Sequence, residues 1–293
     1  EAANELGVPQ IVIGAAADAI FDHGLRHVYQ VYAPATVYLN GVVDMLRAAD
    51  PTATRVAFLY RNDLFANDVV KHARDYAAGQ GMEIVYDQPY DPSAVEFWDY
   101  LPGLAEAGAH LIMAGGLYPD SLALVTQMAY VGVPSRMLVL LVAPTQPSFG
   151  EIGDAAIGVL SPTDWEPLAP YSPEAAASDG LAFYGPTGAV FVRDFRSAYG
   201  YAPSYLAAGG YVAGLLLERS IEQAGSTQRE EVERALASTD VATLFGPIRF
   251  ASGGLQIAHS MSYVQWQPGP NGPQRQVIAP TSIATAPLLY PRP

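Results

Sequence analysis

The chain has 293 residues, half of them hydrophobic, and its 15 basic and 29 acidic side chains give a formal net charge of −14. Such an acidic surface repels phosphate backbones, which makes nucleic acid a poor candidate partner. Because the sequence has no cysteine, disulfides, thiolate metal sites and cysteine nucleophiles are excluded. No run approaches the ~18 apolar residues of a membrane-spanning helix.

Short apolar runs alternate with amphipathic stretches through the first half of the chain. Predicted strands cover residues 10–13, 27–32, 55–60, 83–86, 110–114 and 137–142. Predicted helices cover residues 36–49, 66–80, 94–107 and 119–131. Strands separated by single helices form parallel sheets, whose strands are buried on both faces and therefore continuously apolar. The pattern predicts an α/β fold.

The second half of the chain has a different character. Five prolines between residues 161 and 187 predict a crossing segment or rim loop and not a helix. Three helices are then predicted over residues 189–199, 204–224 and 230–237, followed by strands over 247–250 and 262–266 and by a proline-rich tail.

Motifs of enzymes are absent from the sequence. It contains no G-x-S-x-G elbow, no G-x-x-x-x-G-K-[ST] loop and no H-E-x-x-H, so neither a catalytic residue nor a cofactor is predicted. His23 and His27 lie close to Asp22, but Gly24 separates them and a strand begins at His27. A solvated turn is therefore favoured over a metal site.

Ligands of open α/β sheets bind beyond the carboxyl ends of the strands. Four loops occupy such positions here: residues 14–18, 61–65, 115–118 and 143–146. They are short and rich in glycine, alanine and aromatic residues, so backbone N–H groups and ring faces are the expected binding groups. Together the four loops favour a ligand cleft over ordinary βα turns.

Several segments follow one another in a specific order and spacing: VPQIVIGAAADAIF, RVAFLYRNDLFANDVV, HLIMAGGLYPDSLALVTQMAYVGV, FRSAYGYAPSYLAAGGYVAGLLLERSIEQAGS, LFGPIRF and MSYVQWQPG. They resemble the type I periplasmic binding proteins of the leucine/isoleucine/valine-binding family. The resemblance implies a non-enzymatic, extracytoplasmic receptor that delivers a small ligand to the permease of an ABC importer. A ligand-sensing domain of the same fold, within a signalling or regulatory protein, is the alternative.

The resemblance also implies two Rossmann-like lobes joined by three crossovers, with ligand trapped as a hinge closes. Residues 1–32 and 163–262 would form lobe I, and residues 33–162 and 263–293 would form lobe II. Family members begin lobe I with further βα units, on the order of 90 residues, that have no counterpart here. Lobe I is therefore expected to be incomplete at its N-terminus, and the signal peptide to be lost with the missing part.

The family's ligand site maps onto specific positions of this sequence. The loop that holds a ligand carboxylate falls on Ala15, Ala16, Ala17 and Asp18; the covering aromatic falls on Phe65; the next loops supply Gly116, Leu117, Tyr118 and Ala143; and Trp165 and Tyr205 lie at the crossover and the lobe I rim. The acidic residue that would pair with an α-ammonium falls near Leu141, where no carboxylate exists. Because a buried ammonium without a counter-charge is costly, an aromatic or aliphatic organic acid or an amide is expected to fit better than a standard amino acid.

Overall fold

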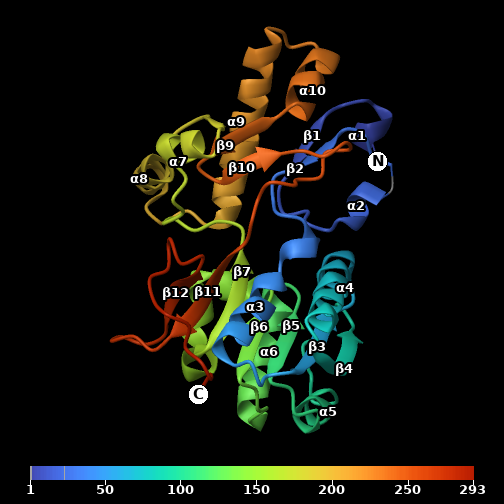
Figure 1. Cartoon of the computed structure of the whole chain (residues 1–293), viewed down its shortest axis with the longest axis vertical. Coiled ribbons are helices and arrows are strands. Elements are labelled where there is room, and N and C mark those ends of the chain that lie inside the picture. Colours follow the sequence, from blue (N-terminus) through green and yellow to red (C-terminus); the bar gives the residue numbers. More distant parts are fainter. Residues whose placement is uncertain (1, 23) are drawn as a thin grey trace. The chain divides into compact units, whose positions relative to one another are not determined.

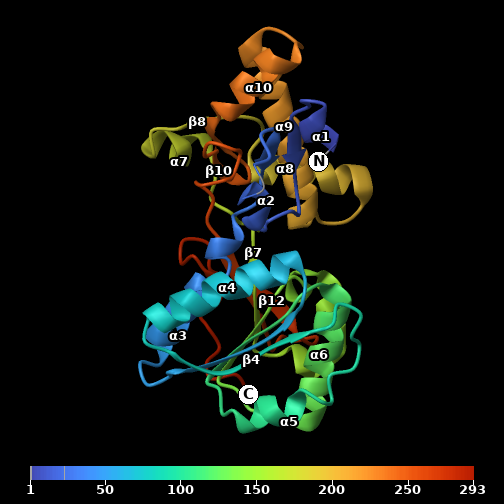
Figure 2. The ribbon, with the colours of Figure 1, turned by 90° about the vertical axis from the view of Figure 1, so that its right-hand side faces the viewer.

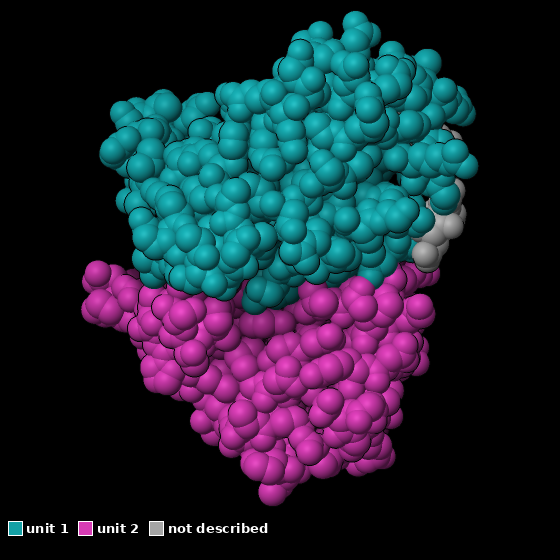
Figure 3. Space-filling model, turned by 45° about the horizontal axis from the view of Figure 1, so that its top comes forward, with its two compact units in different colours: residues 1–35, 164–261 teal, residues 36–163, 262–293 magenta. Residues whose placement is uncertain are grey.

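The computed structural model describes residues 2–22 and 24–293, and the chain divides into two compact units, coloured separately in Figure 3. Unit 1 comprises residues 1–35 and 164–261, and unit 2 comprises residues 36–163 and 262–293. The chain therefore passes from one unit to the other three times. Across the described residues, no helix combines the length and apolar character needed to cross a bilayer.

Unit 2 is built on a seven-stranded sheet of order β12-β11-β7-β6-β5-β3-β4 (Figure 1). Its strands are β3 (Arg55–Arg61), β4 (Glu83–Tyr90), β5 (Leu111–Gly115), β6 (Met137–Leu140), β7 (Val159–Thr163), β11 (Ser262–Gln267) and β12 (Gln274–Ala279). The five strands from β4 to β7 are parallel, whereas β11 pairs antiparallel with both β7 and β12. The carboxyl ends of the parallel strands consequently share one edge of the sheet.

Helices cover both faces of this sheet (Figure 2). They are α3 (Asn40–Ala49) and α4 (Leu64–Gly79) on one face and α5 (Leu101–Glu106) and α6 (Tyr118–Val131) on the other, with 3₁₀ segments η2 (Ala143–Thr145) and η3 (Pro147–Ala156) before β7. In β3, Ala57 and Leu59 belong to the core that contains the apolar residues of α5 and α6. Val56 and Phe58 are also fully buried. Burial on two faces explains why the strand is apolar at every position.

Unit 1 contains two small sheets and a bundle of helices. Its elements are α1 (Ala2–Glu5), β1 (Gln10–Val12), α2 (Ala19–Asp22), β2 (Val28–Gln30), α7 (Pro173–Ser178), β8 (Ala182–Phe183), α8 (Gly188–Tyr199), α9 (Tyr205–Ala224), α10 (Arg229–Ala237), β9 (Asp240–Thr243) and β10 (Gly246–Arg249), and the 3₁₀ segment η1 (Ala35–Val37) leads out of it. Strands β1 and β2 pair in parallel, and β9 lies between β8 and β10. Aromatic and aliphatic side chains of β2, α8, α9 and β9 form the core of the unit.

Three predictions from the sequence are wrong in detail. The helix predicted over residues 94–107 begins at Leu101, because Pro102 occupies its first turn, where a proline is tolerated. Helix α7 lies within the segment predicted to be loop, and the side chain of Ser172 caps it. The proline-rich tail contains β12, whose antiparallel pairing was not foreseen.

Candidate functional site

The loop that follows β1 in unit 1 has an unusual hydrogen-bonding pattern. Its carbonyl groups are occupied, since Ala15 O accepts from Gln30 Nε2 at 2.8 Å, Ala16 O from the Ala35 amide at 2.8 Å and Ala17 O from the Ile20 amide at 3.2 Å. Among the described residues, the amide N–H groups of the same three alanines donate no hydrogen bond. Ala16 and Ala17 are only 4% and 2% exposed. Ala15 is partly buried. Buried amides are rarely left unpaired, so the donors of Ala16 and Ala17 require an acceptor, and the Ala15 amide beside them is available to the same group.

A tyrosine that the sequence did not single out lies in the same unit. The Tyr32 ring stacks on Phe245 and contacts Tyr205, a predicted site residue, with centroid distances of 5.8 and 5.6 Å. Its hydroxyl is buried and has no hydrogen-bond partner within the described part of the chain. Burial raises the pKa of Tyr32, and the nearby Asp164 and Tyr205 add to this effect. The hydroxyl therefore stays protonated and is a free donor.

Trp165 lies in the core of unit 1. It is 2% exposed, its ring meets Phe191 edge-on, and its indole N–H donates to Leu244 O at 3.0 Å. These contacts satisfy the side chain, and packing accounts for its position. His27, the second residue of the predicted histidine turn, bonds to Glu233 through Nδ1, whereas His23 lies outside the described residues.

In unit 2, Phe65 lies in the first turn of α4, beyond the carboxyl end of β3. The Asp63 side chain caps this helix by accepting from the Ala66 amide at 2.9 Å. The ring of Phe65 meets Tyr38 edge-on at a centroid distance of 5.5 Å. The position of Phe65 is thus set both by the cap and by an aromatic neighbour.

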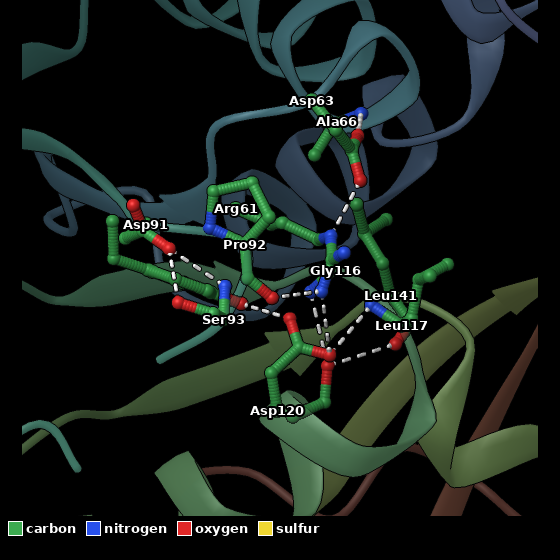
Figure 4. Close-up of polar contacts among 12 residues, drawn as sticks. Arg61, Asp63, Ala66, Asp91, Pro92, Ser93, Gly116, Leu117, Asp120 and Leu141 are labelled. Atoms are coloured by element: carbon green, nitrogen blue, oxygen red, sulfur yellow. Dashed lines mark hydrogen bonds and ion pairs between the residues drawn. The ribbon is translucent and has the colours of Figure 1, made fainter. Parts of the chain in front are cut away.

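A buried carboxylate organises the loop after β5, as Figure 4 shows. Asp120 is 3% exposed and accepts from the Leu117 amide at 3.1 Å. It also accepts from the Tyr90 hydroxyl at 2.6 Å. The guanidinium of Arg61 lies 3.8 Å from Asp120 and donates to Asp63 at 2.7 Å. Burial raises the pKa of Tyr90, and its hydrogen bond to Asp120 adds to the effect, so the hydroxyl stays a donor.

Because Gly116 has no side chain, Arg61 and Asp120 can pack directly against it. A Cβ atom at position 116 would lie 2.5 Å from Arg61 Cβ, which is closer than two non-bonded carbon atoms approach. The Gly116 amide donates to Ser121 Oγ at 3.0 Å, and the Ser121 hydroxyl in turn lies 3.4 Å from Leu141 O. The loops after β5 and β6 are therefore connected. Leu117 remains 42% exposed, and the hydroxyl of Tyr118 bonds to Ser148 Oγ at 2.7 Å.

The loop after β6 begins with a strained residue. Val142 has φ 60° and ψ −59°, and the Ala143 amide donates to Leu141 O at 2.6 Å, which together describe a tight γ-turn. A β-branched residue with positive φ is costly. Thr145 holds the turn by donating to Val142 O from its amide and from its hydroxyl, at 3.1 and 2.6 Å. The turn places Ala143, which is fully buried, at the start of η2, three residues after the end of β6.

Replacing Val142 by glycine is expected to raise the free energy of unfolding by about 1 kcal/mol, because glycine adopts positive φ without steric cost. Urea unfolding measures the change. Val131→Gly, at the end of helix α6, is the matched control and is expected to lower stability by about 1 kcal/mol. If Val142→Gly lost as much stability as the control, Val142 would not be a strained residue.

Of the eleven predicted site residues, unit 1 holds Ala15–Asp18, Trp165 and Tyr205, and unit 2 holds Phe65, Gly116, Leu117, Tyr118 and Ala143. Within unit 2 they lie in loops or in the first turns of helices that follow the carboxyl ends of β3, β5 and β6. Tyr32 and Asp120 were not predicted as site residues. Arg61, the last residue of β3, lies in the candidate loop 61–65 but was not among the predicted site residues.

A family model and a curated relative both match this chain over most of its length. A family model described as periplasmic binding protein matches residues 1–273. The Leu/Ile/Val-binding protein homolog 7 of Brucella abortus (strain 2308) is 24% identical over 277 residues, which cover 90% of this chain and 67% of the relative. The chain thus spans about two-thirds of that relative's length.

Two solved structures share the fold. A leucine-binding protein from Thermotoga maritima superposes with a TM-score of 0.75 at 22% identity, covering 96% of this chain and 76% of that one. An ABC transporter solute-binding protein from R. palustris, in complex with benzoate, gives a TM-score of 0.73 at 18% identity, covering 96% of this chain and 75% of that one.

Proposed function

We propose, because this chain belongs to the periplasmic binding protein family, that it captures a small organic acid and delivers it to an ABC importer. The family consists of solute-binding proteins and not of enzymes, and it implies an extracytoplasmic location. Delivery requires a permease as partner, which is part of the proposal.

The lobes of this receptor are proposed to correspond to the two compact units. Lobe I, expected over residues 1–32 and 163–262, corresponds to unit 1, and lobe II, expected over residues 33–162 and 263–293, corresponds to unit 2. Hinge closure in such receptors brings loops from both lobes onto one ligand.

The unpaired amides of Ala15, Ala16 and Ala17 carry the proposal. Three consecutive N–H groups with occupied carbonyls form a set of donors without acceptors of their own. Hydrogen bonds from amides to an ionised carboxylate are shorter and stronger than those to a neutral group. A ligand carboxylate would therefore satisfy these donors better than a neutral amide or alcohol would, and the Tyr32 hydroxyl is a further candidate donor.

The rest of the ligand is proposed to be apolar and without an ammonium group. The loop at Leu141 carries no carboxylate, and the nearby Asp120 already accepts from Leu117 and Tyr90. An ammonium would therefore lack a counter-charge. The ring of Phe65 and the side chain of Leu117 favour an aromatic or branched aliphatic body. The R. palustris protein, whose fold is the same, is described with benzoate.

A thermal-shift screen with matched ligand pairs tests this proposal. Each acid is compared with its primary amide: benzoate with benzamide, and isovalerate with isovaleramide, together with leucine. A ligand present at 100 times its dissociation constant adds about 2.7 kcal/mol to the free energy of unfolding. We expect an acid to raise the melting temperature and its amide to leave it unchanged, because only the carboxylate suits three amide donors.

Two variants test whether a ligand stabilises the protein by binding at the proposed site. Phe65→Ala is expected to weaken the binding of an aromatic acid, whereas Tyr130→Ala, at a ring that is 84% exposed on α6, is expected to leave it unchanged. Equal stabilisation by acid and amide would contradict the carboxylate assignment. If neither the acids nor leucine shift the melting temperature, the receptor proposal itself fails.

A further inference from the structure

We propose that unit 2 carries a second binding site, for a small oxyanion such as a carboxylate or phosphate, at the amino ends of β6 and β7. A cavity of about 460 Å³ lies there, lined by the end of α6 and the loop after it, by the end of η3, and by Arg292 in the C-terminal tail. The candidate loops at Gly116 and Ala143 follow the carboxyl ends of the strands, so the cavity is at the opposite edge of the sheet.

Arg292 brings an uncompensated positive charge to this cavity. Its Nε atom is buried and has no hydrogen-bond partner, and within the described residues its guanidinium forms no ion pair. Burial lowers the pKa of the Arg292 guanidinium, as expected for a cation removed from water without a counter-charge. Such a group is costly to bury, and an anion beside it would offset the cost.

A second unpaired donor lines the same cavity. The hydroxyl of Ser135 is buried and has no partner, and it comes from the loop between α6 and β6. Two unsatisfied donors from segments far apart in the sequence therefore meet at one cavity. Asp154, the acidic residue of the lining, is exposed, and no hydrogen bond or ion pair joins it to Arg292.

Several contacts hold Arg292 in place. Its amide donates to Arg136 O at 2.9 Å, and the Tyr290 hydroxyl donates to Asp50 at 2.7 Å. The Gln265 side chain bonds to both the amide and the carbonyl of Leu289, at 2.8 and 3.0 Å. A Cβ atom at Gly158 would lie 2.5 Å from Arg292 Cβ, so only glycine permits this approach. The backbone and Cβ of Arg292 are thus held in place, which lowers the entropic cost of binding.

The lining indicates the kind of anion. A planar guanidinium suits the paired oxygens of a carboxylate or phosphate, and a hydroxyl donor adds a third bond. Met128 and Val133 supply apolar surface at the same cavity. A monocarboxylate with a small apolar body matches the charge, the donors and the apolar wall, whereas free phosphate would use only the donors.

The Nε–H resonance of Arg292 in a ¹H–¹⁵N spectrum tests the inference on the full chain, and its absence from Arg292→Gln identifies it. Acetate and phosphate are titrated separately, with sodium chloride holding the ionic strength constant. We expect a saturable shift, with acetate as strong as phosphate or stronger. In Arg292→Lys, which lacks this resonance, binding is followed through the backbone amide of Ser135, which lines the cavity and reports on the wild type as well. Because a hydrogen bond to a charged group contributes more than a factor of ten in affinity, Arg292→Lys should bind at least about tenfold more weakly.

Control variants make the result decisive. Ser135→Ala should weaken binding while keeping the Arg292 resonance, and Arg196→Gln, at an exposed arginine of α8, should leave the titration unchanged. Saturation by phosphate but not by acetate would still support the oxyanion site and assign it to an inorganic ion. A shift that never saturates with either anion, or an equal titration in Ser135→Ala and the wild type, would overturn the inference.

Discussion

Replacing Asp120 by alanine is expected to lower the free energy of unfolding by about 3 kcal/mol, since removal of one partner of a buried charged network leaves the others unsatisfied. The hydroxyl of Tyr90 and the amide of Leu117 would lose their acceptor, and Arg61 would lose a nearby negative charge. Urea unfolding of the purified chain measures the change.

The same substitution should also affect the proposed site, because the Asp120 carboxylate holds the amide of Leu117. Asp120→Asn keeps one acceptor oxygen and should lose only about 1 kcal/mol. Asp99→Ala is the matched control: Asp99 is exposed in unit 2, and its loss should change stability by less than about 0.5 kcal/mol. Equal losses of unfolding free energy in Asp120→Ala and Asp99→Ala would show that the contacts of Asp120 do not stabilise the fold.

The protein is expected to lose up to about 3 kcal/mol of stability through His259 as the pH falls from 6.5 to 4. Burial lowers the pKa of His259 from 6.5 to about 4 in the folded chain. Below pH 6.5 the unfolded chain therefore binds a proton that the folded chain does not, and protonation favours unfolding. The contribution is constant above pH 6.5 and is fully lost near pH 4.

The surroundings of His259 explain this behaviour. Its Nε2 lies 2.7 Å from Asp164 O, and because a carbonyl only accepts, Nε2 carries the proton of the neutral ring. The ring stacks on Phe245 at 5.0 Å, and Nδ1 is buried without a partner. A proton added at Nδ1 would place an unsolvated charge in an apolar core.

His259→Gln isolates this effect from the titration of carboxylates at low pH. Glutamine retains an N–H donor for Asp164 O but gains no charge in this range. The difference in unfolding free energy between wild type and variant, measured in urea at several pH values from 4 to 8, should change by about 3 kcal/mol in total. A difference that is independent of pH would show that His259 is not the titrating group.

Most of the sheet in unit 2 was predictable from residue patterns. Strand β5 is a continuous apolar run, as burial on two faces requires. Helix α6 ends at Val131, as predicted, and the next residue, Gly132, adopts the left-handed conformation typical of a helix end. Strand β12 escaped detection because its Gln and Arg residues lie at the edge of the sheet, where burial imposes no apolar pattern.

The candidate site was less predictable, for reasons of geometry. Arg61, Tyr90 and Asp120 are far apart in sequence, and only the parallel arrangement of β3, β4 and β5 places their ends together. No residue type marks the turn at Val142, because valine disfavours the conformation that it adopts there. The alanine loop was predicted from its position after a strand, and its role toward a carboxylate from a family resemblance, while its unpaired amides are visible only in the structure.

The amides of Ala15, Ala16 and Ala17 have a consequence for how ligand preference can change. Main-chain donors are the same for every residue except proline, so substitutions in this loop alter its shape far more readily than its chemistry. If these amides hold the constant part of a ligand, divergence toward new ligands has to proceed through side chains such as Phe65 and Leu117. Libraries built to redirect specificity would therefore be most productive at those positions, with the alanine loop left intact.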